Sequence, residues 1–178
     1  MARSSSCSTI RISRCAKSSP RRRCEPSPRT SADIGRARLG DVIVYARPVR
    51  FDEADPAGIV FFARYASFAH ESLENFFDGL EGGYPALIQK RGIGLPTVRL
   101  EADFKAPLRY GDGLRVETSC ERLGRTSATL THEIKNAGTL ELCAVIRQVV
   151  VTVVLDGLRP VPIPPDVRAT LEANLAGD

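Results

Sequence analysis

The sequence predicts an α+β domain in which one long helix is followed by a series of antiparallel strands. One strand-like segment precedes the strongest helical pattern, and four strand-like segments follow it without intervening helices. Strands that are segregated from one dominant helix favour α+β over a doubly wound α/β sheet. The chain has 178 residues, 43% of them hydrophobic, which is enough for one domain with a core.

The first strand is predicted over residues 41–51, where Val42, Val44 and Ala46 alternate with Ile43, Tyr45 and Arg47. Residues 52–58 interrupt it. A helix is then predicted over residues 62–80, because its apolar residues recur at the i, i+3, i+4 spacing of one helical face. Gly79 and Gly82-Gly83 are typical helix stops. A shorter helix is predicted over residues 85–90.

Four further strands are predicted over residues 95–108, 114–123, 125–135 and 140–155. Between them, residues 110–113, 123–124 and 136–138 have the composition of hairpin turns. Pro164-Pro165 is expected to lead into a short C-terminal helix.

The charge is unevenly distributed along the chain. Residues 1–38 are rich in Ser, Arg and Pro and carry ten basic and two acidic residues, which leaves fifteen basic and nineteen acidic residues for the rest. We therefore predict a disordered basic leader at 1–38 and a domain at 39–178. The leader is a solvated tail or an over-extended reading frame, an Arg-rich nucleic-acid arm, or a transit peptide. The overall charge of +4 does not by itself indicate a nucleic-acid partner.

The composition also argues against several classes. No segment approaches the roughly 20 apolar residues of a membrane span, and no apolar core of a secretory signal is present in the leader. The five cysteines form no CxxC motif, and only His70 and His132 are available beside them. We expect a reduced, cytoplasmic protein without a metal, a cofactor or a membrane partner.

Asp55 is the first candidate for chemistry, because it precedes Pro56 and lies ahead of the long helix. In one interpretation Asp55-Pro56 starts a turn of helix, with the aspartate as N-cap. In the other, the carboxylate is a nucleophile or a general base beside a helix N-terminus, whose free N–H groups stabilise an oxyanion.

The segment 55–65, DPAGIVFFARY, is preceded by Val49-Arg50-Phe51 and followed by a helix. It resembles the active-site segment of 4-hydroxybenzoyl-CoA thioesterases and related acyl-CoA thioesterases of the hotdog fold. The resemblance covers nearly the whole domain and none of the leader. It implies a curved antiparallel sheet wrapped around one long helix, and hydrolysis of an acyl-CoA thioester to free acid and CoA. It also implies a homodimer with active sites at its interface, assembled into a homotetramer.

The resemblance also implies residue roles. Asp55 matches the catalytic aspartate, which attacks the thioester carbonyl or activates water. Phe62 falls where a backbone N–H binds the thioester oxygen, and its aromatic side chain favours an aromatic acyl group such as 4-hydroxybenzoyl over a short aliphatic one. Arg125, helped by Arg122, resembles a contact to the CoA phosphates. His70 falls near positions that line the acyl pocket.

Alternatives remain for these residues and for the function. His70 is otherwise a half-buried helix residue and Arg125 an exposed hairpin residue. Glu71 and Glu74 are interpreted as solvated or pocket-edge residues, and His132 as structural. The rival functions are a hotdog acyl-carrier-protein thioesterase or dehydratase, or a non-catalytic acyl-ligand or nucleic-acid binding module that uses the leader.

Overall fold

The computed structural model describes residues 37–39 and 42–176. All but the last two residues of the predicted leader lie outside this part of the chain. Strand β1 (Ala37–Leu39) pairs antiparallel with β2 (Val42–Pro48). The sheet therefore begins two residues before the predicted domain boundary.

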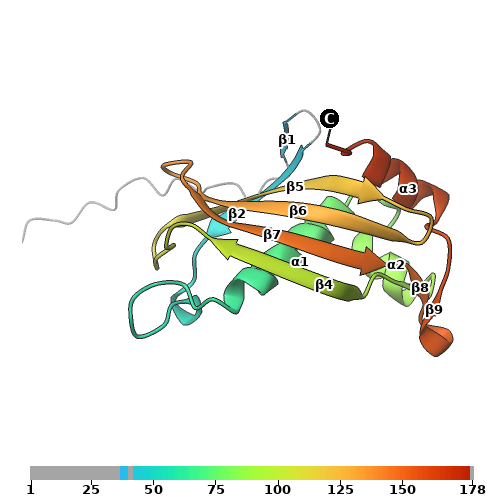
Figure 1. Ribbon diagram of the computed structural model, residues 1–178, viewed down its shortest axis with the longest axis horizontal. Helices are drawn as coiled ribbons and strands as arrows, with labels where there is room; N and C mark the ends of the chain where they lie inside the picture. Colours follow the sequence, from blue (N-terminus) through green and yellow to red (C-terminus); the bar gives the residue numbers. More distant parts are fainter. Residues whose placement is uncertain (1–36, 40–41, 177–178) are drawn as a thin grey trace, which may run out of the picture. The chain divides into compact units, whose positions relative to one another are not determined.

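Within the described residues, the main sheet has six antiparallel strands in the order β1-β2-β5-β6-β7-β4. Figure 1 shows β5, β6, β7 and β4 side by side with the helix α1 behind them, and β4 at the lower edge. A small second sheet joins three two-residue strands in the order β3-β8-β9. The remaining bounds are β3 (Ile93–Gly94), β4 (Thr97–Phe104), β5 (Gly113–Leu123), β6 (Ser127–Asn136), β7 (Leu142–Val151), β8 (Val153–Val154) and β9 (Arg159–Pro160).

One of the three predicted hairpin turns is wrong. Strand β4 pairs with β7 and not with β5, so residues 110–113 do not form a hairpin turn. Instead the chain crosses one end of the sheet after β4, where Leu108 O accepts the N–H of Val60 and Asp112 O accepts that of Val49. Glycine and aspartate indicate a reversal of the chain direction, but they do not determine which strands pair in the sheet. The other two turns connect β5 to β6 and β6 to β7, as predicted.

Helix α1 (Arg64–Phe76) packs on the inner face of the sheet. Its Phe68, Leu73 and Phe76 are fully buried, as the predicted apolar face requires. Helix α2 (Gly83–Gln89) and helix α3 (Pro165–Glu172) occupy the positions predicted for the two short helices. Gly82 precedes α2 with φ +74°, a conformation that glycine adopts at little cost. The α+β hotdog architecture, a curved antiparallel sheet around one long helix, is confirmed.

In the part of the chain that the structure describes, no helix is both long enough and apolar enough to cross a membrane.

Candidate active site

Residues 53–61 form a loop that leaves the short 3-10 helix η1 (Phe51–Glu53) and returns before α1. At its base, Glu53 O accepts the N–H of Phe61 at 2.9 Å, and Ala54 forms an antiparallel bridge with Val60. At its tip, the N–H of Asp55 donates to Ile59 O at 2.8 Å. These bonds hold the loop as a narrow hairpin with Asp55 beside its tip.

Asp55-Pro56 does not start a turn of helix, so that interpretation was wrong. The Asp55 Oδ1 accepts the N–H of Ala57 at 2.8 Å, while Gly58 closes the turn with φ +77°. This is an Asx turn, in which the side chain bonds to the backbone two residues on. Helix α1 begins only at Arg64, with Ala63 as its N-cap, because the chain first pairs back on the loop base.

The Asp55 carboxylate is half-buried, and its Oδ2 has no hydrogen-bond partner among the described residues. One oxygen is therefore oriented by the loop backbone, and the other is free to meet a substrate or a water molecule. This arrangement suits a nucleophile or a general base.

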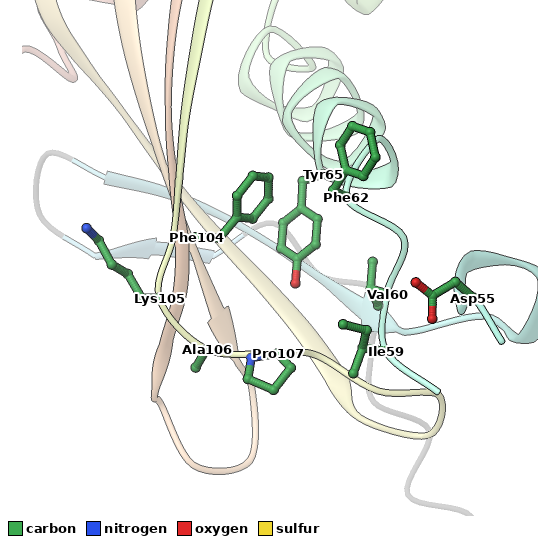
Figure 2. A pocket seen from close by; sticks show the side chains of 9 residues that line it. All are labelled: Asp55, Ile59, Val60, Phe62, Tyr65, Phe104, Lys105, Ala106 and Pro107. Atoms are coloured by element: carbon green, nitrogen blue, oxygen red, sulfur yellow. The ribbon is translucent and has the colours of Figure 1, made fainter. Parts of the chain in front are cut away.

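A cavity of about 340 Å³ lies beside this carboxylate. Figure 2 shows Asp55 and the side chains that surround the cavity, which come from the loop, the start of α1 and the end of β4. Tyr65 and Phe104 meet edge to face, with ring centroids 5.1 Å apart, and burial raises the pKa of Tyr65. The lining is Asp55, Ile59, Val60, Phe62, Tyr65, Phe104, Lys105, Ala106 and Pro107.

Phe62 lies immediately before α1, and its side chain lines the same cavity. Its backbone N–H has no acceptor within the described residues, while those of Arg64 and Tyr65 donate to Phe61 O and Phe62 O. An unpaired N–H at a helix N-terminus is a favourable partner for a developing negative charge. The structure thus brings two of the four predicted site residues, Asp55 and Phe62, to one cavity.

His70 does not reach this cavity within one protomer. It is exposed on α1, so the expectation of a half-buried histidine is wrong. Its Nε2 lies 3.2 Å from Glu74 Oε1, and its ring faces that of Tyr84. His70 and Tyr84 border a second groove, also of about 340 Å³, beside Leu95, Thr97 and Leu158.

Arg125 is likewise distant from Asp55 in the same chain. It is exposed in the turn between β5 and β6, whereas the Asp55 loop lies near the other end of β5 (Figure 1). The 11 residues of β5 span roughly 35 Å. Arg122 lies at the end of β5, where it lines a shallow depression with Arg99 and Arg147.

The sequence did not predict that three charged residues next to the Asp55 loop are buried or half-buried. Arg47 and Glu53 are each 4% exposed, and they pair with each other. Glu71 is the third member, so its interpretation as a solvated or pocket-edge residue was wrong. A single arginine in a β-like run is usually a solvent-facing residue, and no pattern in the sequence indicated that Arg47 is buried.

Across residues 37–39 and 42–176 there is no group of three or more His, Cys, Asp or Glu side chains arranged to hold a metal ion. Cys120 and Cys143 are buried and free, and burial raises the pKa of both thiols. Neither borders the Asp55 cavity.

Comparison with known proteins identifies the class. The Thioesterase-like superfamily profile matches residues 49–171, which is more than half of the chain, and the protein belongs to this superfamily. The predicted enzyme class, a thioester hydrolase of the hotdog fold, is therefore confirmed.

Two curated relatives are named 1,4-dihydroxy-2-naphthoyl-CoA hydrolase. The relative from Thermosynechococcus vestitus is 30% identical over 129 residues, covering 72% of this chain and 88% of its own. The relative from Synechococcus elongatus is 33% identical over 107 residues, covering 56% and 79%.

Two solved structures are similar as well. A 1,4-dihydroxy-2-naphthoyl-CoA thioesterase from Synechocystis has a TM-score of 0.67 and 25% identity, covering 73% of this chain and 95% of its own. A gentisyl-coenzyme A thioesterase has a TM-score of 0.63 and 32% identity, covering 72% and 98%.

Proposed function

We propose that this protein hydrolyses an aromatic acyl-CoA thioester to the free acid and CoA, with Asp55 as the catalytic carboxylate. One observation carries the proposal: Asp55 and Phe62 line the same aromatic-lined cavity, and the Phe62 N–H has no acceptor among the described residues. A thioester carbonyl there has an attacking group on one side and an oxyanion donor on the other. The relatives named as CoA thioester hydrolases support the same reaction.

The chemistry proceeds by one of two routes. Asp55 attacks the carbonyl carbon to form a mixed anhydride and release CoA thiolate, and water then cleaves the anhydride. Alternatively, Asp55 takes a proton from a water molecule that attacks the carbonyl directly, and the C–S bond then breaks to release CoA thiolate and the free acid. In both routes the Phe62 N–H stabilises the oxyanion, a contribution of about 2.7–4 kcal/mol for one such donor.

The cavity lining favours an aromatic acyl group. Phe62, Tyr65 and Phe104 offer ring faces and edges to a flat substrate. The relatives are named for naphthoyl and gentisyl thioesters, which also carry aromatic acyl groups. The 4-hydroxybenzoyl group predicted from the sequence is one member of this class.

The edge strand β4 supports a homodimer. All eight of its residues are exposed, and its outer edge has no partner strand in the described part of the chain. Val98, Leu100 and Phe104 are large apolar residues on this strand. Antiparallel pairing of β4 with the same strand of a second copy closes the open edge and covers them. The homotetramer predicted from the sequence would assemble from such dimers.

This pairing also gathers the dispersed candidates. In an antiparallel β4 pair, the Phe104 end of one protomer lies beside the Thr97 end of the other. The partner's His70 groove and the partner's Arg125 turn lie at that Thr97 end. We therefore assign His70 to the acyl pocket and Arg125 to the CoA phosphates of the opposite subunit.

The first experiment tests the chemistry. Asp55→Asn should lower the turnover of 4-hydroxybenzoyl-, gentisyl- and 1,4-dihydroxy-2-naphthoyl-CoA by orders of magnitude, while binding of CoA and the melting temperature stay near wild type. Hexanoyl-CoA is the aliphatic comparison. Near-normal turnover in the variant would exclude Asp55, and a preference for hexanoyl-CoA would exclude the aromatic assignment.

The second experiment tests the shared site. Asp55→Asn and Arg125→Met are made as separate proteins, unfolded, mixed and refolded together, and assayed well below KM. In a shared site, each mixed dimer contains one site with both residues intact, so activity exceeds the mean of the two parent variants. Activity equal to the mean of the two parents would show that Arg125 does not complete the partner's site.

A further inference from the structure

Arg47 lies on β2 at the centre of a partly buried charged cluster, which we call the Arg47 cluster: Tyr45, Arg47, Glu53 and Glu71. The Arg47 Nε donates to Glu71 Oε2 at 2.7 Å, and Nη2 donates to Glu71 Oε1 at 3.1 Å. Toward Glu53, Nη1 donates to Oε2 at 3.0 Å and Nη2 to Oε1 at 2.6 Å. Arg47 therefore holds each of two carboxylates by two hydrogen bonds.

The guanidinium uses its whole donor set. The remaining N–H, on Nη1, donates to Pro48 O at 2.8 Å, so all five N–H groups have acceptors. The same group lies 5.0 Å from the ring centroid of Phe68. Lysine has three donors and no planar fork, so it cannot reproduce this geometry.

The two carboxylates belong to the two parts of the candidate site. Glu53 is at the base of the Asp55 loop, where its Oε2 also accepts the Arg50 N–H at 2.7 Å and its backbone oxygen accepts the Phe61 N–H. Glu71 is on α1, the helix whose first turn follows Phe62. A single side chain thus connects the segment that carries the attacking group with the helix that directly follows the proposed oxyanion donor.

The geometry points to Arg47 as a positioning residue for the thioesterase reaction: it sets the separation between the Asp55 carboxylate and the Phe62 N–H by holding Glu53 and Glu71 at once. This inference rests on the proposed function. Arg47 does not line the cavity, so its proposed role is to position other groups. Its effect is on geometry, and a misplacement of about 1 Å can cost a hundredfold in rate.

The test is Arg47→Lys, which keeps the charge and loses the fork. We expect kcat to fall by about tenfold to a hundredfold per folded enzyme, with KM changed by less than about threefold. Arg115→Lys is the matched control, because Arg115 pairs with the carboxylate of Glu117 on the neighbouring strand β5 and does not line the Asp55 cavity. This control should leave kcat within about twofold of wild type. Circular dichroism gives the folded fraction of each variant.

A second arm separates positioning from general stability. If Arg47 acts through Asp55, then Arg47→Lys should cause almost no further loss of kcat in the Asp55→Asn background. Equal fold-losses in both backgrounds, or an unchanged kcat in Arg47→Lys alone, would overturn the inference. Should Arg47→Lys not fold, Glu53→Gln gives the same comparison. An active Asp55→Asn enzyme would instead overturn the proposed function.

Discussion

The core contains two polar clusters that differ in charge and in what they connect. The Arg47 cluster is ionic and ties β2 to the Asp55 loop and to α1. The second, which we call the His132 cluster, consists of Ser72, Thr118, His132, Gln148 and Thr97. It is neutral and ties α1 to the sheet. The comparison separates polar groups that shape the site from polar groups that hold the domain together.

The His132 cluster is a chain of hydrogen bonds across the inner face of the sheet. Ser72 Oγ and Thr118 Oγ1 are 2.6 Å apart, and Thr118 Oγ1 lies 2.8 Å from His132 Nδ1. His132 Nε2 lies 2.9 Å from Gln148 Oε1, and Gln148 Nε2 donates to Thr97 Oγ1 at 2.7 Å. Since Gln148 Oε1 can only accept, His132 Nε2 carries the proton and Nδ1 accepts from Thr118.

In both clusters the polar groups are hydrogen-bonded, but the free-energy cost of burying them differs. Neutral groups lose only hydrogen bonds with water on burial, and the chain replaces them. Burying a charge costs several kcal/mol, as for Arg47 and Glu53, and ion pairing offsets this cost only with near-ideal geometry. The Arg47 cluster lies beside the Asp55 loop, where a fixed geometry would position the candidate active site.

The largest expected effect comes from breaking the ionic cluster. Glu53→Ala removes one partner and leaves Arg47 with two unpaired donors in the core. Loss of one partner of a buried pair typically costs about 3–5 kcal/mol. Urea denaturation should show this loss in the free energy of unfolding, and a loss below about 1 kcal/mol would mean that water replaces the carboxylate.

The next effect is a pH dependence that belongs to the His132 cluster. Burial lowers the pKa of His132 to about 4, although its hydrogen bond to Gln148 acts in the opposite direction. In the unfolded chain this pKa is near 6.5, so the unfolded state binds a proton between these values and the folded state does not. Stability is therefore complete above about pH 6.5 and falls by about 3 kcal/mol as the pH drops toward 4.

His132→Gln should remove this part of the pH dependence. His70→Gln is the matched control, because the chain has two histidines and His70 is exposed. Unfolding free energies measured from pH 4 to 7 should flatten in the first variant and keep their slope in the second. The same slope in both variants would contradict a buried, neutral His132.

The Arg47 cluster should respond at lower pH. Burial alone would raise the pKa of Glu53, but hydrogen bonds from Arg47 and the Arg50 N–H and the charge of Arg47 lower it overall. The ion pair thus stabilises the fold above the unfolded value near 4.5, and this contribution is lost as the pH falls through the lowered pKa. Stability of Glu53→Gln relative to wild type should be constant above pH 5 and should converge below it.

A smaller effect is expected at the end of the His132 cluster that lies on helix α1. Ser72→Ala removes one donor to Thr118 and should cost about 1 kcal/mol, because Thr118 still donates to His132. The kcat per folded enzyme should remain at the wild-type value, since Ser72 does not border the Asp55 cavity. A fall in kcat would mean that the His132 cluster also positions the site.

Much of the fold follows from local patterns. The apolar face of α1, the strands β2, β5, β6 and β7 and the helix after Pro164 could all be predicted from periodicity and turn chemistry. The position of β4 at the edge of the sheet could not be predicted. Turn residues indicate that the chain reverses, but not which strand it pairs with. Asp55 and Phe62 were found through a contiguous motif, which a linear sequence preserves.

The sequence by itself determined the element order, the class of enzyme and the two residues that meet at the cavity. Tertiary structure alone decided that His70 faces a separate groove and that Arg47 joins Glu53 to Glu71. The physical reason is that local propensity depends on neighbours in the chain. Burial of a charge depends instead on distant partners, such as Glu71, 24 residues from Arg47, which only the fold brings within hydrogen-bond distance.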